Sequence, residues 1–256
     1  MVAFQERTKR IIFPLLTLVV LIGIWHLVVV LFDLKPYILP TPLAVPENLF
    51  KNLSLLIGHT IVTLHETFMG LLLSIGFGVA ISLLIVSSDV LDKTITPYII
   101  LSQSFPKTAI APLMVIWFGY DTLPKIIMSF LIGFFPITMN MVMGLKSPGE
   151  DLIDLIKSLS AAKAQIFLKI RIPASIPYFF NGIKISIPMC LVGAVVGEFV
   201  GANKGIGYLI LMANNEFNTV LVFSGLIVLM AVGALLYFVA QAIENLAAPW
   251  YRKEIK

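Results

Sequence analysis

The sequence predicts an all-α protein, a polytopic transmembrane bundle of about six helices, and two observations carry this prediction. The chain has 256 residues, of which 59% are hydrophobic and only 12% are charged, whereas soluble globular domains are about a quarter charged. The apolar residues also gather in long runs, and about 20 helical residues suffice to cross a hydrocarbon layer of roughly 30 Å. We therefore expect 1–256 to form a single transmembrane domain.

The spans follow from apolar runs that are bounded by charged residues and by Gly, Pro or Asn. The first run, 11–32, follows three basic residues in the segment 1–10. It is too long for a signal peptide and lacks a small-residue cleavage site, so we expect it to be a retained span. The other five predicted spans are 60–86, 94–118, 123–145, 176–200 and 219–247.

The basic residues predict the orientation of these spans, because positively charged short loops resist translocation. With the N-terminus inside, twelve Lys and Arg residues fall on the cytoplasmic side: Arg7, Lys9, Arg10, Lys93, Lys146, Lys157, Lys163, Lys169, Arg171, Arg252, Lys253 and Lys256. The outer side has four, namely Lys35, Lys51, Lys125 and Lys204. Both termini, 1–10 and 248–256, are therefore expected in the cytoplasm.

The longest cytoplasmic connection, 147–175, is too polar to enter the bilayer and has the pattern of two helices. Its first half repeats apolar residues at helical spacing from Leu152 to Leu159, Ser160 interrupts the pattern, and a second helical segment runs from Ala161 to Pro173. A plain connection between spans is usually a few residues long. We therefore expect a helix, a turn and a helix that dock a cytoplasmic partner.

The stretch 154–173 resembles the cytoplasmic signature of ABC importer permeases, in which Glu-Ala-Ala is followed by glycine and later by Ile-x-Leu-Pro. The positions that match are Asp154, Leu155 and Ile156 for Glu-Ala-Ala, Ser160 for the glycine, and Ile170, Ile172 and Pro173 for the end. The sequence departs from the signature at the alanines and at the glycine. Since glycine alone reaches positive φ without strain, the turn at Ser160 is expected to have its own backbone geometry.

Further segments resemble the permeases of the nitrate, sulfonate, taurine and bicarbonate group. They are 105–113 with the later Phe134-Phe135-Pro136, and 197–202 with 205–210. Within that group, Pro106-Lys107 and the run from Thr63 to Glu66 are similar to members that carry thiamine-precursor pyrimidines or riboflavin. The resemblance thus leaves a small organic anion and a vitamin precursor open as substrates.

This resemblance implies a type I ABC importer permease fold and a defined set of partners. The partners are a cytoplasmic ATP-binding subunit, a second permease copy that makes a homodimer, and an external or periplasmic substrate-binding protein, all within membrane lipid. The resemblance also implies residues that couple to the ATPase, namely Asp154, Ser160, Ala161, Ala162, Ile170 and Pro173.

Several activities lack the residues that they need. No G-x-x-x-x-G-K-[ST] motif occurs, so we expect ATP on the partner subunit and no cofactor or catalytic residue on this chain. The single cysteine and the three histidines do not have metal-ligand spacing, so no metal is expected either. The net charge of +4 comes without an interleaved basic and aromatic face, which argues against nucleic acid.

Three ionisable residues inside spans are candidates for the translocation pathway, because a charge in hydrocarbon is costly. Lys107 either lines the pathway or extends its amine to the cytoplasmic interface. Glu198 either helps to form an outer gate or is hydrogen-bonded as a structural tie. Glu66, beside His65, either belongs to the pathway or is a solvated headgroup residue.

Gly193, Gly197 and Gly201 recur at every fourth position of the fifth span. This spacing places three residues without side chains on one stripe of the helix, where another helix can approach closely. We expect the stripe to be a packing surface.

Two other functions fit the sequence less well than an importer permease does. An ATP-independent channel or secondary carrier would leave the cytoplasmic helical segment without use, and inverted repeats are not evident. A membrane enzyme would use Glu66, His65 or Glu198, but their spacing does not assemble a nucleophile, a base and an orienting group.

Overall fold

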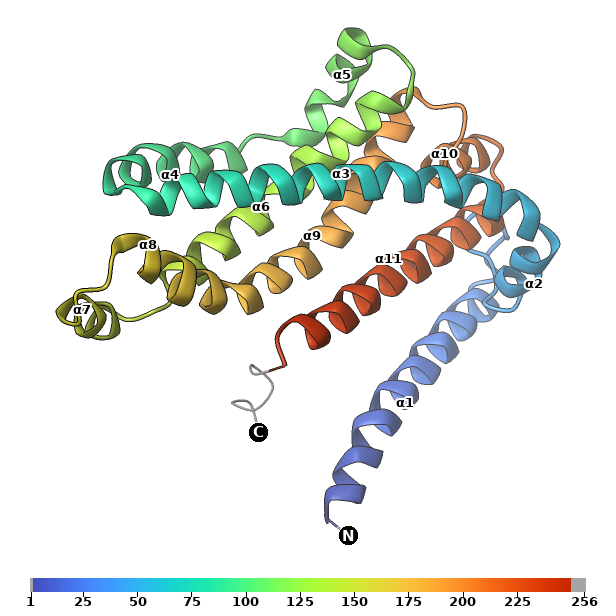
Figure 1. Cartoon of the computed structure of the whole chain (residues 1–256). Coiled ribbons are helices and arrows are strands. Elements are labelled where there is room, and N and C mark those ends of the chain that lie inside the picture. The colour runs from blue at the N-terminus through green and yellow to red at the C-terminus, as the bar shows by residue number, and fades with distance from the viewer. Residues whose placement is uncertain (1, 250–256) are drawn as a thin grey trace. The chain divides into compact units, whose positions relative to one another are not determined.

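The computed structural model describes the backbone of residues 2–249 and the side chains of residues 12–249, and all regular elements in this part are helices (Figure 1). Part of the predicted cytoplasmic C-terminus, 250–256, lies outside the described residues. The elements are α1 Val2–Leu31, α2 Ala44–Lys51, α3 Leu53–Ser87, α4 Asp89–Gln103, the 3₁₀-helix η1 Lys107–Ile110, α5 Ala111–Phe118, α6 Thr122–Lys146, α7 Glu150–Ser158, α8 Lys163–Ile166, the π-helix η2 Phe167–Arg171, α9 Ile172–Gly201, α10 Ile206–Asn215 and α11 Thr219–Ala247.

Five helical segments in the described part are long and apolar enough to cross a membrane, or six if one bent pair counts as a single span. The bent pair is α4 with the segment Lys107–Phe118. The prediction of an all-α bundle of about six spans is therefore confirmed.

The chain divides into two compact units, and each is described by itself. The first consists of Met1–Gly58 and Leu209–Val228, and the second of His59–Tyr208 and Leu229–Lys256. In the first unit the Trp25 and Phe223 ring centroids lie 5.3 Å apart, and the Thr219 hydroxyl donates to the Tyr37 carbonyl at 2.6 Å. All the sites discussed below belong to the second unit.

The glycine stripe of α9 lies against neighbouring helices. A Cβ atom added at Gly193 would stand 2.6 Å from the carbonyl oxygen of Met128, and one at Gly197 would stand 2.9 Å from Cα of Lys125. Both neighbours belong to α6, which runs beside α9 in Figure 1. At Gly201 the added atom would stand 2.9 Å from a methyl group of Val115 in α5. The backbones of α9 and α6 thus approach to a distance that a side chain would prevent.

The third span differs from the single helix expected over 94–118. Helix α4 ends at Gln103, the next helical residue is Lys107, and the two parts are bent by 79°. Pro106 has no N–H to continue the helix, and its ring disfavours helical geometry at Phe105. The proline therefore breaks the span near its middle.

The second helical segment of 147–175 also differs from the expectation, which was a separate helix that stops near Pro173. The helical course is continuous over Lys163–Gly201, 39 residues that include the fifth span. The turn Phe167–Arg171 within this course is a π-helix. The ring of Pro173 would press on the carbonyl group four residues earlier, which lies in this wider turn. The helix therefore continues past Pro173 instead of ending there.

Candidate functional site

The break between α4 and η1 exposes polar groups within a span. Ser102, Gln103 and Ser104 are exposed, and Lys107 is half-buried. Non-helical backbone at membrane depth is tolerated only where protein buries it or where it lines a cavity filled with water. The break is therefore a candidate lining segment.

Lys107 lies over an aromatic ring of α6. Its ammonium nitrogen is 4.6 Å from the centroid of the Phe135 ring, and Phe135 is itself buried. A cation over the face of a phenyl ring is attracted by the negative potential of that face. The contact directs the lysine toward protein, and its role in transport stays a prediction.

Glu198 sits in a buried network that holds the start of α10. Its carboxylate accepts hydrogen bonds from the Thr63 hydroxyl at 2.6 Å and from the Gly207 N–H at 2.5 Å. The Thr63 hydroxyl in turn accepts from the Ile206 N–H at 2.8 Å. Gly205 has φ of +112°, and a Cβ atom there would clash with the Glu198 carboxyl group. These contacts favour a structural role for Glu198 over a role in an outer gate.

Glu66 and Lys125 are buried close to this network. Their residues are 2% and 3% exposed, so neither is solvated at the membrane surface. Lys125, expected among the outer-side lysines, donates to the carbonyl oxygens of Tyr120 and Asp121 at 2.7 and 2.6 Å. Within the described part of the chain, Glu66 Oε2 has no hydrogen-bond partner. A pathway role for Glu66 would require water to reach a carboxyl group that the bundle encloses.

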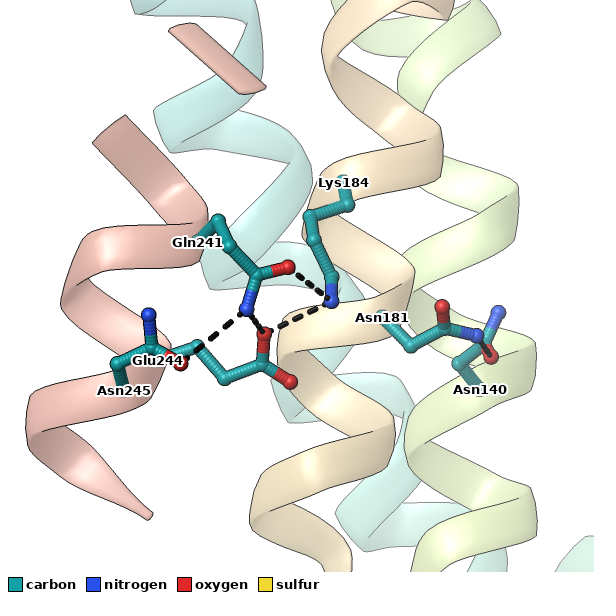
Figure 2. Close-up of polar contacts among 6 residues, drawn as sticks. All are labelled: Asn140, Asn181, Lys184, Gln241, Glu244 and Asn245. Carbon is teal, nitrogen blue, oxygen red and sulfur yellow. Dashed lines mark hydrogen bonds and ion pairs between the residues drawn. The ribbon is translucent and has the colours of Figure 1, made fainter. Parts of the chain in front are cut away.

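An intramembrane ion pair that the sequence reasoning missed joins α9 to α11 (Figure 2). Lys184 Nζ lies 2.8 Å from Glu244 Oε2 and donates to Gln241 Oε1 at 3.1 Å. Gln241 also donates to the same Glu244 oxygen at 2.7 Å. The side chains of Lys184 and Glu244 are only 14% and 12% exposed. The pair is therefore largely removed from both water and lipid.

One helical turn before Lys184, Asn181 connects α9 to α6 (Figure 2). Its amide nitrogen donates to the Asn140 side-chain oxygen at 2.9 Å, and Asn140 donates to the Pro136 carbonyl at 2.8 Å. One turn of α9 is thus bonded to both α6 and α11. The sequence did contain a signal for the ion pair. Lys184 and Glu244 each lie inside an apolar run, where an ionisable side chain needs a partner in the bundle.

The segment 147–175, predicted to be cytoplasmic, contains α7, and this helix ends in a well-formed cap. Ser160 has φ of +62°, the left-handed backbone that glycine adopts without strain. The Ser160 N–H donates to the Lys157 carbonyl, and the Ala161 N–H to that of Ile156, the two bonds of a Schellman motif. This cap turns the chain sharply between α7 and α8, at the position of the signature's glycine.

The coupling candidates occupy different parts of this segment. Asp154 is exposed and pairs with Lys157 at 2.8 Å. Ala162 is also exposed, and its N–H donates to the Gln165 side chain at 2.9 Å. Ile170 and Pro173 instead lie in the continuous helix that leads into α9. The exposed surface of this segment thus comprises most of α7, the turn after it and residues 163–165 of α8, and α8 leads directly into a span.

The pathway candidates divide into two groups. Lys107 lies at the α4 break against Phe135, whereas Glu66 and Glu198 belong to the buried cluster with Thr63 and Lys125. No group of three or more His, Cys, Asp or Glu suited to a metal ion occurs among the described residues.

Comparisons with known proteins identify relatives along nearly the whole chain. Residues 70–253 match the family model described as binding-protein-dependent transport system inner membrane component. The chain is 41% identical over 229 residues to a Haemophilus influenzae protein named "Probable ABC transporter permease protein", across 90% of this chain and 94% of that one. It is 33% identical over 251 residues to the formylaminopyrimidine transport permease protein ThiX of Halalkalibacterium halodurans, across 98% and 100%.

A solved structure has a similar fold over three quarters of the chain. A chain of the MetNI methionine ABC transporter in an inward-facing conformation superimposes with a TM-score of 0.63 at 18% sequence identity. The match covers 75% of this chain and 96% of that one. The expected type I importer permease fold is therefore confirmed.

Proposed function

Because the chain belongs to the family of binding-protein-dependent transport system inner membrane components, we propose that it forms half of the translocation pathway of an ATP-driven importer. It is an ABC transporter permease of a bacterial inner membrane. The substrate crosses beside the exposed break between α4 and η1, and ATP is hydrolysed by a partner subunit. We assign the pathway to this break because exposed irregular backbone at membrane depth does not face lipid and therefore lines a cavity filled with water.

The proposed partners are those that membership of this family implies. The ATP-binding subunit receives α7, on which Leu152 and Leu155 are exposed. A second copy of the chain closes the other half of the pathway as a homodimer, and an external or periplasmic binding protein delivers the substrate. Both termini lie in the cytoplasm, because the twelve basic residues counted above gather on that side.

A thiamine-precursor pyrimidine of the formylaminopyrimidine type is the substrate class that we favour. The support is the relative ThiX, which aligns over its entire length and over 98% of this chain. Riboflavin and the small organic anions, such as sulfonate, taurine, nitrate or bicarbonate, are the competing classes. Transport of labelled compounds by the reconstituted complex distinguishes them.

Replacement of Ala162 by tryptophan tests the coupling part of this function. Ala162 is exposed at the turn between α7 and α8, so a bulky side chain should prevent the turn from seating in the ATP-binding subunit. We expect the rate of substrate uptake into proteoliposomes to fall at least about tenfold, which corresponds to roughly 1.4 kcal/mol in the activation free energy of transport. ATP hydrolysis is expected to become independent of the binding protein.

The variant Ser160→Gly is the matched control, because glycine accepts the observed φ of +62°. It should keep normal uptake. The unmodified chain should also copurify with an ATP-binding subunit and with two permease copies per complex. Normal uptake by Ala162→Trp, or a chain that transports without any ATPase, would contradict the proposal.

Replacement of Lys107 by alanine tests the pathway. The substitution removes the ammonium group above Phe135, and with it a positive charge at the break. We expect uptake to fall about tenfold while copurification with the ATP-binding subunit is unchanged, and Lys107→Arg to give an intermediate rate, because it keeps the cation–π contact.

Thiol labelling at position 107 provides the second readout. A cysteine there should react with a water-soluble reagent in one nucleotide state and be protected in another, whereas the native Cys190 is buried. If the labelling of position 107 is the same in all nucleotide states and Lys107→Ala keeps full uptake, Lys107 is an interfacial anchor and does not belong to the pathway.

A further inference from the structure

A groove along α4 is charged at one end and apolar at the other. It has a cavity of about 710 Å³, and six of the residues that line it are Asp92, Lys93, Thr96, Ile100, Leu101 and Lys146. Those from α4 recur at spacings of three and four residues, so they share one face of the helix. Lys93 stands near the start of α4, and Leu101 lies eight residues further, roughly 12 Å along the axis.

The charges of this groove leave one amine available. Asp92 accepts from Lys146 at 2.6 Å and from the Thr96 hydroxyl at 2.9 Å. Lys93 is exposed and has no hydrogen bond or ion pair within the part of the chain that the structure describes. Two lysines and one aspartate give the groove a net charge of +1. An anion placed beside Lys93 would therefore meet an unpaired amine, with a second amine close by.

The apolar end continues directly from these amines. Ile100 and Leu101 are 50% and 67% exposed, and they lie deeper in the span than Lys93. The groove thus passes from a cationic end to an apolar end along one face of α4. A lipid has the matching order of groups, an anionic headgroup followed by an acyl chain. Anionic lipids are enriched in the cytoplasmic leaflet, and basic pockets on that side bind their headgroups.

We propose that this groove binds an anionic phospholipid of the cytoplasmic leaflet, with its phosphate beside Lys93 and Lys146 and an acyl chain against Ile100 and Leu101. The inference rests on the membrane orientation given under the proposed function. A second copy of the chain suits the groove less well, because lysine is depleted from the buried parts of protein interfaces. A phospholipid instead leaves the lysine at the water boundary, where its amine is solvated.

Lipid binding to the intact transporter complex in detergent tests the proposal. Native mass spectrometry would follow titrations with phosphatidylglycerol and with phosphatidylcholine. Lys93→Ala should weaken phosphatidylglycerol binding about fivefold, the effect of one lysine near an anionic headgroup, and leave phosphatidylcholine binding unchanged. Lys93→Arg should retain the unmodified affinity.

Lys157→Ala is the matched control, because Lys157 is exposed on the same side but already pairs with Asp154 and lies outside the groove. Equal losses in Lys93→Ala and Lys157→Ala would overturn the proposal, and so would displacement of the lipid by inorganic phosphate at equal concentration. Disulfide cross-linking of two chains through Leu101→Cys would show an interface between copies instead. The assay measures neither uptake nor ATP hydrolysis, so its failure in a complex that still transports counts against this inference alone.

Discussion

Replacement of Glu244 by leucine is expected to lower the free energy of unfolding by about 3–5 kcal/mol, the usual cost of removing one partner from a buried ion pair. Lys184 would keep its charge in a site where its side chain is only 14% exposed. Gln241 would remain as a neutral acceptor at 3.1 Å, which does not compensate the charge. Thermal or denaturant unfolding in detergent measures the change.

The double variant Lys184→Met with Glu244→Leu separates loss of the charge balance from loss of packing. Since well-packed apolar side chains often replace a buried ion pair without loss of stability, the double variant should recover most of the stability that the single variant loses. Additive losses in the double variant would mean that the two side chains act through packing alone. The Lys51–Glu47 pair is a surface comparison, because its side chains are 69% and 65% exposed, and Glu47→Ala should change stability by less than about 1 kcal/mol.

The second large effect is expected at Gly193, where alanine should destabilise the bundle by about 2–3 kcal/mol. The new Cβ atom would stand 2.6 Å from both the Met128 carbonyl oxygen and Cα of Ser129. Both are backbone atoms of α6, which cannot yield as the end of a flexible side chain can. Relief therefore requires α6 and α9 to move apart, and the same unfolding measurement detects the loss.

Gly76 is the matched control for this substitution. It also lies inside a long helix, but an added Cβ atom there would meet nothing within 4 Å. Gly76→Ala should therefore be neutral or stabilise the protein by up to about 1 kcal/mol, because alanine favours helix over glycine. Effects of the same sign at positions 76 and 193 would contradict a specific contact at Gly193.

Periodicity and local chemistry made several features predictable. The apolar runs located the spans because crossing a bilayer demands a continuous length of apolar helix. The interruption at Ser160 located the turn after α7, because the apolar pattern stops there. The spacing of four residues between Gly193, Gly197 and Gly201 implied a common stripe of α9, since residues that far apart lie on one face of a helix.

Features that depend on a second helix were harder to predict. Glu198 and Thr63 are 135 residues apart in the chain, and their 2.6 Å contact follows only from the packing of α3 against α9. The same holds for Lys184 and Glu244, which are 60 residues apart in the chain. The break at Pro106 was visible as a proline, but the proline alone did not tell a gentle kink from a bend of 79°.

The amino-acid sequence was sufficient to show that the chain is a bundle of membrane helices and that a turn at Ser160 follows α7. These properties depend on composition and on neighbours within a few residues, where the 3.6-residue repeat and the cost of polar groups in hydrocarbon act directly. The tertiary structure alone decided which polar groups inside the spans are enclosed with partners, such as Glu198 and Lys184, and which stay open, such as those at the α4 break. That choice depends on which helix faces pack together, because a buried charge persists only where another part of the chain supplies its counter-charge or hydrogen bonds.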